Sequence, residues 1–478
     1  MKKFIVLPLI LSVMGVSMVS ARAQQQSGEL PELLWYVLGD PQPDTAEVCA
    51  AVNEYIKDKV GARLRIVQVS DYFNKLPMVI AGQETFDFAW TNGSLIYQYV
   101  PRGAWLPLDN LLSQYGQNIV KGSPPAALEG AKVNGQIYGL SIQSQLNSTT
   151  VAVIEKQWLD RFNLKAEDIK SFQDLDPLLA GLKRELPNLS FVPGNFAWQL
   201  TYGYDSLGVE PGYIKMSDPN LKVVNIYATP EYKEIISLTR SWFEKGYIRA
   251  DAVTQPDLTQ DKLAGRAPVE IDWVYSVGSE ITRAEQHGGR EMVHAFLSDS
   301  VVNTNTVTSC MTSVSATSKN PELAMKFLDL MMADAYLFNL ITRGIEGKHW
   351  TRIDKDHIRL NQDGGYYLGS LGEWVYMRPT LLYLTEGETP TRWADALEVA
   401  MQATPSPILG FAFDTEPVAN EVANCTAVVK QYELQLITGS VDPNRVLPEF
   451  LAALEAAGSA KVIAEQQRQL DAWKLTKR

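Results

Sequence analysis

The sequence predicts an α/β fold in which helices cover the faces of a mostly parallel sheet. Over the first 100 residues, short apolar runs alternate with segments of helical spacing, which is the pattern of such a sheet. The chain has 478 residues, a length that fits three domains of ~150 residues or two large lobes. With 46% hydrophobic and 21% charged residues, the composition is that of an ordinary globular protein.

The first alternating elements end at turn residues. The apolar run Glu32–Leu38 ends at Gly39-Asp40-Pro41, and the run 86–90 ends before Asn92-Gly93. The expected strands and helices follow one another at 32–38, 45–59, 64–69, 72–81 and 86–90. Because ligands of parallel sheets bind beyond the carboxyl ends of the strands, the loops after 38 and 90 are candidate binding loops.

The rest of the chain is more helical. Pro230 near the start and Gly246 at the end mark a helix over 230–245. Further helices are expected at 155–162, 177–186, 321–335, 418–438, 447–457 and 461–473. Strands are expected at 269–274 and 306–316.

The first 23 residues have the layout of a secretory signal. Lys2 and Lys3 precede an apolar run over 4–19, and Ala21-Arg22-Ala23 places small residues where a signal peptidase cleaves. The apolar run is short for a membrane span, although an uncleaved anchor stays open. We expect a signal peptide at 1–23 and a soluble periplasmic or extracytoplasmic protein, because no lipobox cysteine stands near the cleavage site.

The net charge argues against polyanionic partners. The formal net charge of the chain is −12 at pH 7. Removal of Lys2, Lys3 and Arg22 with the signal peptide would leave a net charge of −15. So acidic a surface is a poor match for nucleic acid or anionic lipid. No later run of 18 or more apolar residues predicts a membrane span.

No motif for a metal, a cofactor or a catalytic nucleophile is present. Cys49, Cys310 and Cys425 lie too far apart for a metal clip, and either three buried thiols or one disulfide would fit them. No two of the four histidines have the i, i+4 spacing of a metal-binding helix. We therefore expect no cofactor and no enzyme, although scattered carboxylates leave a polysaccharide-acting hydrolase open.

Four segments in order resemble one family, the extracellular solute-binding proteins of ABC importers (sugar-binding type 1-like). They are FDFAW at 86–90, WLPLD at 105–109, VNGQIYGL at 133–140 and SKNPELAMKFL at 318–328. Leu140-Ser141 departs from the usual Ile/Val-Pro of the third segment. GIEGKHW at 344–350 and PILGFAFD at 407–414 resemble a LipO-like lipoprotein subgroup with a C-terminal domain of unassigned function.

The resemblance implies a two-lobed periplasmic-binding-protein fold (class II-like), two α/β lobes joined by hinge strands. It places the N-terminal lobe at 24–147 plus about 276–345, and the C-terminal lobe at 148–275 plus about 346–478, with family-specific helices over about 405–478. The chain would cross between lobes near 145–150, near 275–300 and soon after Trp350. The implied function is capture of a carbohydrate by a monomer that delivers it to ABC transporter permease subunits. Several aromatic platforms would suit the rings of an oligosaccharide. A peptide or other polar solute, or an adhesin, are the alternatives.

Candidate ligand residues follow from these strand ends and crossings. Sugar rings have apolar C–H faces and hydroxyl edges, so aromatic platforms beside Asp, Asn, Gln, Glu or Arg side chains suit them. The candidates are Trp35, Tyr36, Asp40, Trp90, Thr91, Asn92, Gln143, Gln145, Asn147, Asp272, Trp273, Tyr275, Glu346, Trp350, Trp374 and Arg378. For each tryptophan the alternative is a core position, since tryptophan is usually largely buried. For Asp40 the alternative is a turn-forming role, and for the amides of 143–147 a solvated strand face.

Overall fold

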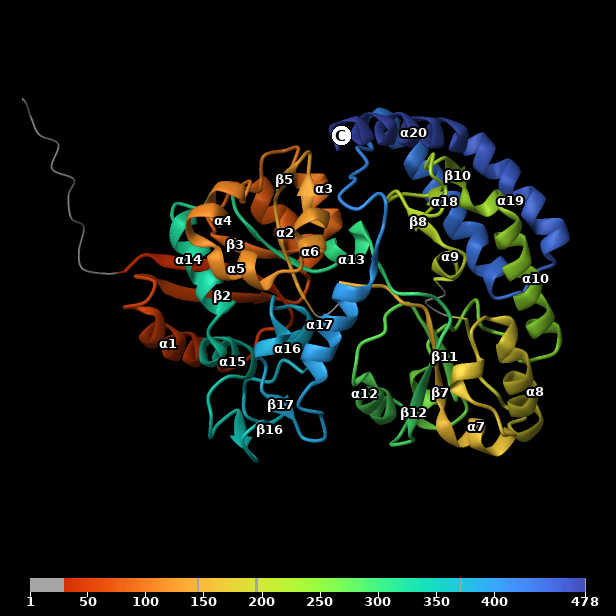
Figure 1. Cartoon of the computed structure of the whole chain (residues 1–478), viewed down its shortest axis with the longest axis horizontal. Helices are drawn as coiled ribbons and strands as arrows, with labels where there is room; N and C mark the ends of the chain where they lie inside the picture. The colour runs from red at the N-terminus through yellow and green to blue at the C-terminus, as the bar shows by residue number, and fades with distance from the viewer. Residues whose placement is uncertain (1–29, 144–145, 194–196, 370, 478) are drawn as a thin grey trace, which may run out of the picture.

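Two α/β lobes lie side by side, and a layer of C-terminal helices covers one of them (Figure 1). The computed structural model describes residues 30–143, 146–193, 197–369 and 371–477. The expected signal peptide at 1–23 lies outside the described residues. The two-lobed α/β architecture predicted from the sequence is confirmed.

The first lobe is built on a five-stranded sheet in the order β2-β1-β3-β14-β6. The strands are β1 (Glu32–Leu38), β2 (Arg63–Val69), β3 (Phe88–Thr91), β6 (Leu140–Ser141) and β14 (Met311–Val314). In β1, Leu33, Trp35 and Val37 alternate with more exposed residues, so one face of the strand is buried in the core. With α1 (Thr45–Ile56) and α2 (Tyr72–Ala81), the predicted alternation is confirmed.

The single strand predicted over 306–316 is wrong, because a short helix precedes it. α13 (Thr304–Thr308) comes first, and β14 follows. Asn303 caps the helix: its side chain accepts a hydrogen bond from the Thr306 amide at 2.9 Å, and the Thr306 hydroxyl accepts one from the Asn303 amide at 3.2 Å. This reciprocal cap overrides the strand preference of the threonine-rich run.

The second lobe has a three-stranded sheet in the order β11-β7-β12, from β7 (Val151–Glu155), β11 (Val269–Asp272) and β12 (Met292–Phe296). Both outer strands pair antiparallel with β7. α8 (Asp176–Glu185) and α10 (Pro230–Glu244) contribute to its core. The mostly parallel sheet expected from the sequence therefore describes β1, β2 and β3 of the first lobe only.

Three chain segments cross between the lobes next to one another. The Ser148 amide donates to the Val301 carbonyl at 2.8 Å, and β13 (Val301–Val302) pairs with β18 (Thr404–Pro405). The Ser406 amide in turn donates to the Val302 carbonyl at 2.7 Å. We call these three segments the hinge.

The lobe boundaries differ from the expected ones in two places. The crossing expected soon after Trp350 comes only at 404, because α17 (Arg392–Gln402) and the strands β15 (Trp350–Arg352), β16 (His357–Leu360) and β17 (Leu384–Thr385) belong to the first lobe. Apolar side chains along 366–403 are buried in the core of the first lobe, so this segment stays in the first lobe until the third crossing. Conversely, β12 lies in the second lobe because it pairs with β7, although 276–345 was expected in the first.

The C-terminal segment forms three helices, as predicted: α18 (Ala419–Ile437), α19 (Pro443–Ala457) and α20 (Ser459–Thr476). They cover the second lobe (Figure 1), where α18 and α19 pack on α10. All three cysteines are buried, unpaired thiols. None of the helices within the described ranges is long and apolar enough to cross a membrane, and no cluster of metal-ligating side chains occurs there.

Candidate ligand site at the hinge

The strand directions of the first sheet turn its binding loops toward the hinge. β14 is antiparallel to both β3 and β6, so β3 and β6 run in the same direction. The chain leaves β6 at Ser141 for the first crossing at Ser148, so β1 and β3 also end on the hinge side. We call this border, with residues 38–40, 71–74, 90–92 and 371–374, the first-lobe edge.

Four aromatic rings gather at the first-lobe edge. The Trp90 ring lies edge-on to Tyr72, Phe73 and Trp374, with ring centroids at 5.6, 5.9 and 6.4 Å. The Tyr72 hydroxyl donates to the Trp90 carbonyl at 2.6 Å and fixes the end of β3. Trp90 itself is only 3% exposed, whereas Phe73 is 53% exposed.

The loop after β1 reaches this cluster through a glycine. Gly39 has a φ of +135°, and a Cβ there would stand 3.1 Å from the Cδ1 of Leu371. Leu371 begins α16 (Leu371–Trp374), the short helix that carries Trp374. A side chain at position 39 would thus strain the backbone and crowd α16, so glycine lets the two loops meet.

Two buried arginines, Arg343 and Arg392, support α16 from behind. Glu373 lies 3.5 Å from Arg343 and 3.5 Å from Arg392, measured between carboxylate oxygen and guanidinium nitrogen. Burial lowers the pKa of Arg343, and the nearby Glu373 carboxylate opposes that change. The Arg392 Nε donates to the Val277 carbonyl at 3.2 Å, which joins α17 of the first lobe to the loop after β11 of the second.

The second sheet also turns one border toward the hinge. β7 begins at Val151, directly after the first crossing, and both Asp272 at the end of β11 and Phe296 at the end of β12 lie opposite Val151. The loop that leaves β11 then runs past the hinge: the Trp273 carbonyl accepts from the Thr149 amide at 3.1 Å. We call this border, with residues 272–278 and 296, the second-lobe edge.

Aromatic and charged side chains share the second-lobe edge. The Tyr275 ring contacts His294 at 5.1 Å and Phe296 at 4.9 Å between centroids. Partial burial raises the pKa of the Tyr275 hydroxyl. Asp272 forms an ion pair with Arg283, which also lies 3.2 Å from Glu270.

Behind this edge, ionised groups are buried within the lobe. Glu155 and His287 are fully buried, and the Glu155 carboxylate accepts from the Arg290 Nε at 2.7 Å. Burial disfavours the charged form of Glu270, yet the His287 hydrogen bond and the Arg283 and Lys262 charges hold its pKa at about 2. Ion pairs and charged hydrogen bonds therefore hold the second-lobe edge in place.

The structure brings eight of the sequence candidates to the two edges; the side chains of Thr91 and Asn92 bond within the first lobe, which leaves six. Asp40, Trp90 and Trp374 lie at the first-lobe edge, and Asp272, Trp273 and Tyr275 at the second. Asp40 is exposed and Trp273 is partly exposed, so both present side-chain surface there.

Other candidates have structural roles in the first lobe or the hinge. Trp35 is 1% exposed and packs against Phe88, Phe327 and Tyr376, so the core alternative holds for it. The remaining side chains engage the protein itself: Tyr36 packs on Phe86, Thr91 bonds Ser313, Asn92 caps α3 (Gly93–Tyr99), Gln143 donates to the Gly122 carbonyl and Asn147 to Thr149. Gln145 lies outside the described residues.

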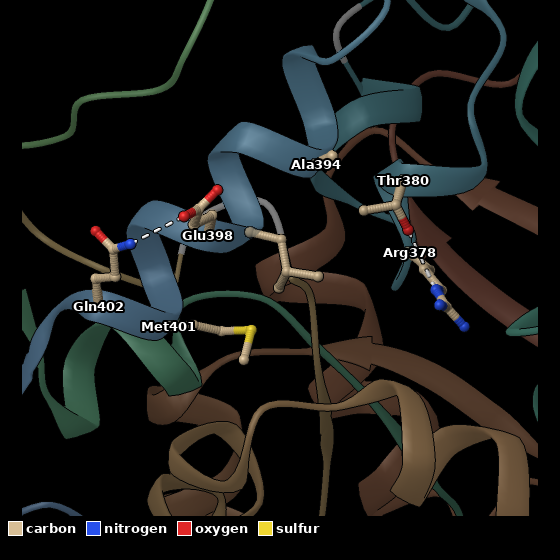
Figure 2. A pocket seen from close by; sticks show the side chains of 7 residues that line it. Arg378, Thr380, Ala394, Glu398, Met401 and Gln402 are labelled. Atoms are coloured by element: carbon tan, nitrogen blue, oxygen red, sulfur yellow. Dashed lines mark hydrogen bonds between the residues drawn. The ribbon is translucent and has the colours of Figure 1, made fainter.

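Three candidates lie away from both edges. Trp350 is 4% exposed and donates to the Gly344 carbonyl at 3.0 Å, while Glu346 is exposed and lies 3.6 Å from Arg352. Arg378 lines a cavity of about 610 Å³ beside α17 (Figure 2). The α17 residues of this cavity include Ala394 and Met401, which lie across the helix from Arg392 and hence from its contact with the second lobe.

The sequence candidates missed Phe73, Phe296, Glu373 and Arg392. Phe73 follows the strand β2 by four positions, and an aromatic residue in the first turn of a helix after a strand could have indicated it. Arg392 had no such signal, because its contacts depend on the late third crossing.

Comparison with known proteins agrees with this architecture. Residues 50–341 match the family described as bacterial extracellular solute-binding protein, and residues 407–475 match a domain of unknown function (DUF3502). The chain is 27% identical over 469 residues to a carbohydrate ABC transporter substrate-binding protein of Streptococcus pneumoniae serotype 4, covering 95% of this chain and 93% of that one.

Solved structures show the same arrangement. The N-glycan transport solute-binding protein NgtS of Streptococcus pneumoniae matches with a TM-score of 0.83 at 25% identity, over 94% of this chain and 100% of that chain. The same protein in complex with Man5GlcNAc matches with a TM-score of 0.70 at 26% identity, over 94% and 99% of the two chains. The family match spans more than half of the sequence, and the chain belongs to the bacterial extracellular solute-binding proteins.

Proposed function

We propose that this protein captures an oligosaccharide between its first-lobe and second-lobe edges and delivers it to an ABC import permease. The observation that carries the proposal is that both edges flank one hinge and both combine aromatic rings with polar groups. The ligand residues that we propose are Asp40, Trp374, Asp272, Trp273 and Tyr275, with the buried Trp90 ring supporting the first-lobe edge from behind.

The ligands of the relatives support a carbohydrate. The relative from Streptococcus pneumoniae serotype 4 is described as a carbohydrate substrate-binding protein, and NgtS was solved with Man1GlcNAc and Man5GlcNAc. Aromatic faces beside carboxylates suit the C–H faces and hydroxyl edges of such sugars.

A difference among the NgtS structures supports hinge closure. The match is 0.83 in TM-score for the structure whose description names no ligand, but 0.72 and 0.70 for the two glycan complexes. The identities are nearly the same, so the NgtS structures differ from one another in conformation. We infer that the lobes rotate about the three-segment hinge when a ligand binds, and the present structure has the higher TM-score with the NgtS structure for which no ligand is named.

We further propose that the protein works outside the cytoplasm, as a monomer and without chemistry of its own. The family description is extracellular, and a binder needs only capture, closure and delivery. A peptide or another polar solute is the second candidate ligand, because exposed aromatic and amide groups would also suit an extended peptide.

Ligand-dependent stabilisation tests the proposal. Thermal unfolding should be measured with Man1GlcNAc, Man5GlcNAc, unrelated oligosaccharides and peptides. Each ligand should be present at a concentration far above the micromolar range. A ligand that binds only the folded state at about 100 times its Kd stabilises by about 2.7 kcal/mol, which raises the melting temperature by several degrees. A shift with peptides alone would replace the carbohydrate by the second candidate, and release of free sugar from the glycans would contradict a pure binder.

A further inference from the structure

Exposed aromatic side chains are concentrated at the two edges. Among the described residues, the most exposed aromatic side chains are Tyr336 at 54%, Phe73 at 53% and Phe296 at 48%. Phe73 belongs to the first-lobe edge and Phe296 to the second-lobe edge. Tyr336 lies elsewhere, at the start of α15 (Ala335–Arg343), where it packs on Tyr55 of α1.

Each of the two phenylalanines is held by a second ring. The Phe73 ring meets Trp90 at 5.9 Å and 83°, and the Phe296 ring meets Tyr275 at 4.9 Å and 77°. In both pairs the partner is more buried than the phenylalanine. Edge-to-face contact fixes the orientation of an aromatic ring while leaving part of its surface uncovered.

Both phenylalanines lie beside polar groups that could bond hydroxyls. Next to Phe73, the exposed Asn74 side chain donates to Asp71 at 2.9 Å. Next to Phe296, the Tyr275 ring also meets His294, whose Nδ1 lies 2.9 Å from Glu280. An apolar ring surrounded by donors and acceptors matches the surface of a sugar unit.

An exposed phenylalanine leaves hydrophobic stabilisation unused. Burial of apolar surface stabilises in proportion to the area removed from water, and 53% of the Phe73 side chain stays exposed. A ligand ring that covers it would recover this free energy as affinity.

We propose that Phe73 and Phe296 are a pair of ring-stacking residues, one on each lobe, each of which covers the apolar face of a different sugar unit. The ligand then has at least two units and contacts both lobes. This inference rests on the proposed function and extends it, because neither residue was among the candidates of the sequence.

Substitution of each phenylalanine tests the pair. Binding of Man1GlcNAc and Man5GlcNAc should be measured by calorimetry for the wild type, Phe73→Ala and Phe296→Ala. We expect each variant to weaken binding about tenfold, because truncation of a central aromatic contact lowers affinity by at least this order. Tyr336→Ala is the matched control, since Tyr336 has nearly the same exposure and also packs on a ring.

Conservative variants separate stacking from a folding defect. Phe73→Tyr and Phe296→Tyr should bind within about twofold of the wild type, whereas Phe73→Leu and Phe296→Leu should resemble the alanine variants. Melting temperatures without ligand should stay close to that of the wild type.

The outcomes distinguish this inference from the function beneath it. If the wild type binds glycan and both alanine variants bind as well as Tyr336→Ala does, the stacking pair is wrong and the proposed function stands. If only one variant loses affinity, the two-lobed pair is wrong. If the wild type binds neither these glycans nor any other oligosaccharide of the thermal unfolding panel, the proposed function fails and the inference with it.

Discussion

The two edges that flank the hinge are held in place by different forces. At the first-lobe edge, Trp90 packs among Tyr72, Phe73 and Trp374, and the Tyr72 hydroxyl bonds its carbonyl. At the second-lobe edge, Asp272 pairs with Arg283, and charged groups continue inward to Glu270 and Glu155.

A buried carboxylate in the second lobe offers a physical reason for the difference. The first sheet has five strands and a large apolar core, whereas the second has three, and its central strand ends in the fully buried Glu155. A buried carboxylate is tolerated only with partners, so the second lobe needs its cationic side chains. Behind α16 of the first-lobe edge, Arg343 and Arg392 flank Glu373. The two edges should therefore respond differently to truncation and to acid.

The largest effect is expected for Trp35→Ala in the first lobe. The Trp35 ring is 1% exposed and touches three other rings, so its removal leaves a cavity in the core under the edge. We expect the free energy of unfolding of this lobe to fall by about 3–5 kcal/mol. Hydrogen exchange of the β1 and β3 amides measures this loss of unfolding free energy within the first lobe. The loss should be the same at pH 7 and pH 5, and a loss below about 1 kcal/mol would contradict a ring-supported edge.

The next largest effect is expected for Glu270→Gln in the second lobe, and it depends on pH. The folded protein lowers the pKa of Glu270 from 4.5 to about 2. Its ionised form therefore adds stability above pH 4.5, and this stability is lost as the pH falls toward 2. The shift corresponds to about 3 kcal/mol at pH 7, which Glu270→Gln should remove because glutamine resembles the protonated acid.

Urea denaturation of wild type and variant across this range checks the prediction. The difference between them should shrink as the pH falls from about 4.5 to about 2, since the wild-type acid then becomes protonated too. Glu386→Gln serves as the control, because Glu386 pairs with Arg359 at the surface with both side chains 62% exposed. A pH-independent difference for Glu270→Gln would show that shape, and not charge, supports the second-lobe edge.

The sequence predicted local elements well and lobe membership poorly. The bounds of β1 and α2 agree fully with the predicted runs, because apolar alternation, helical spacing and glycine stops act within a few residues. Such local signals did not reveal the position of the third crossing between the lobes. Whether 346–403 covers the first or the second lobe depends on contacts such as those of Trp393 and Tyr376 with residues far away in the chain.

The same limit explains the mixed result for the candidate site. Trp90 lies at a strand end beside the hinge, as its sequence position predicts, but like Trp35 and Thr91 it is buried. Strand ends can be located from sequence, but the exposure of a given ring depends on what packs over it. Phe73 was missed for that reason, because its exposure follows from the position of Trp90 behind it.

The smallest effect on the free energy of unfolding is expected for Glu346→Gln. This variant tests whether an exposed ion pair stabilises the first lobe. Glu346 lies 3.6 Å from Arg352, with 56% and 36% of the two side chains exposed. Such a pair contributes up to about 0.5 kcal/mol, and less in about 1 M salt. Arg352 also lies over the rings of Trp350 and Tyr383, at 5.2 and 4.7 Å, so it keeps its place without the carboxylate. Urea denaturation should therefore hardly distinguish the variant from the wild type, and a loss above 1 kcal/mol would mean that ion pairs support the first lobe as they do the second.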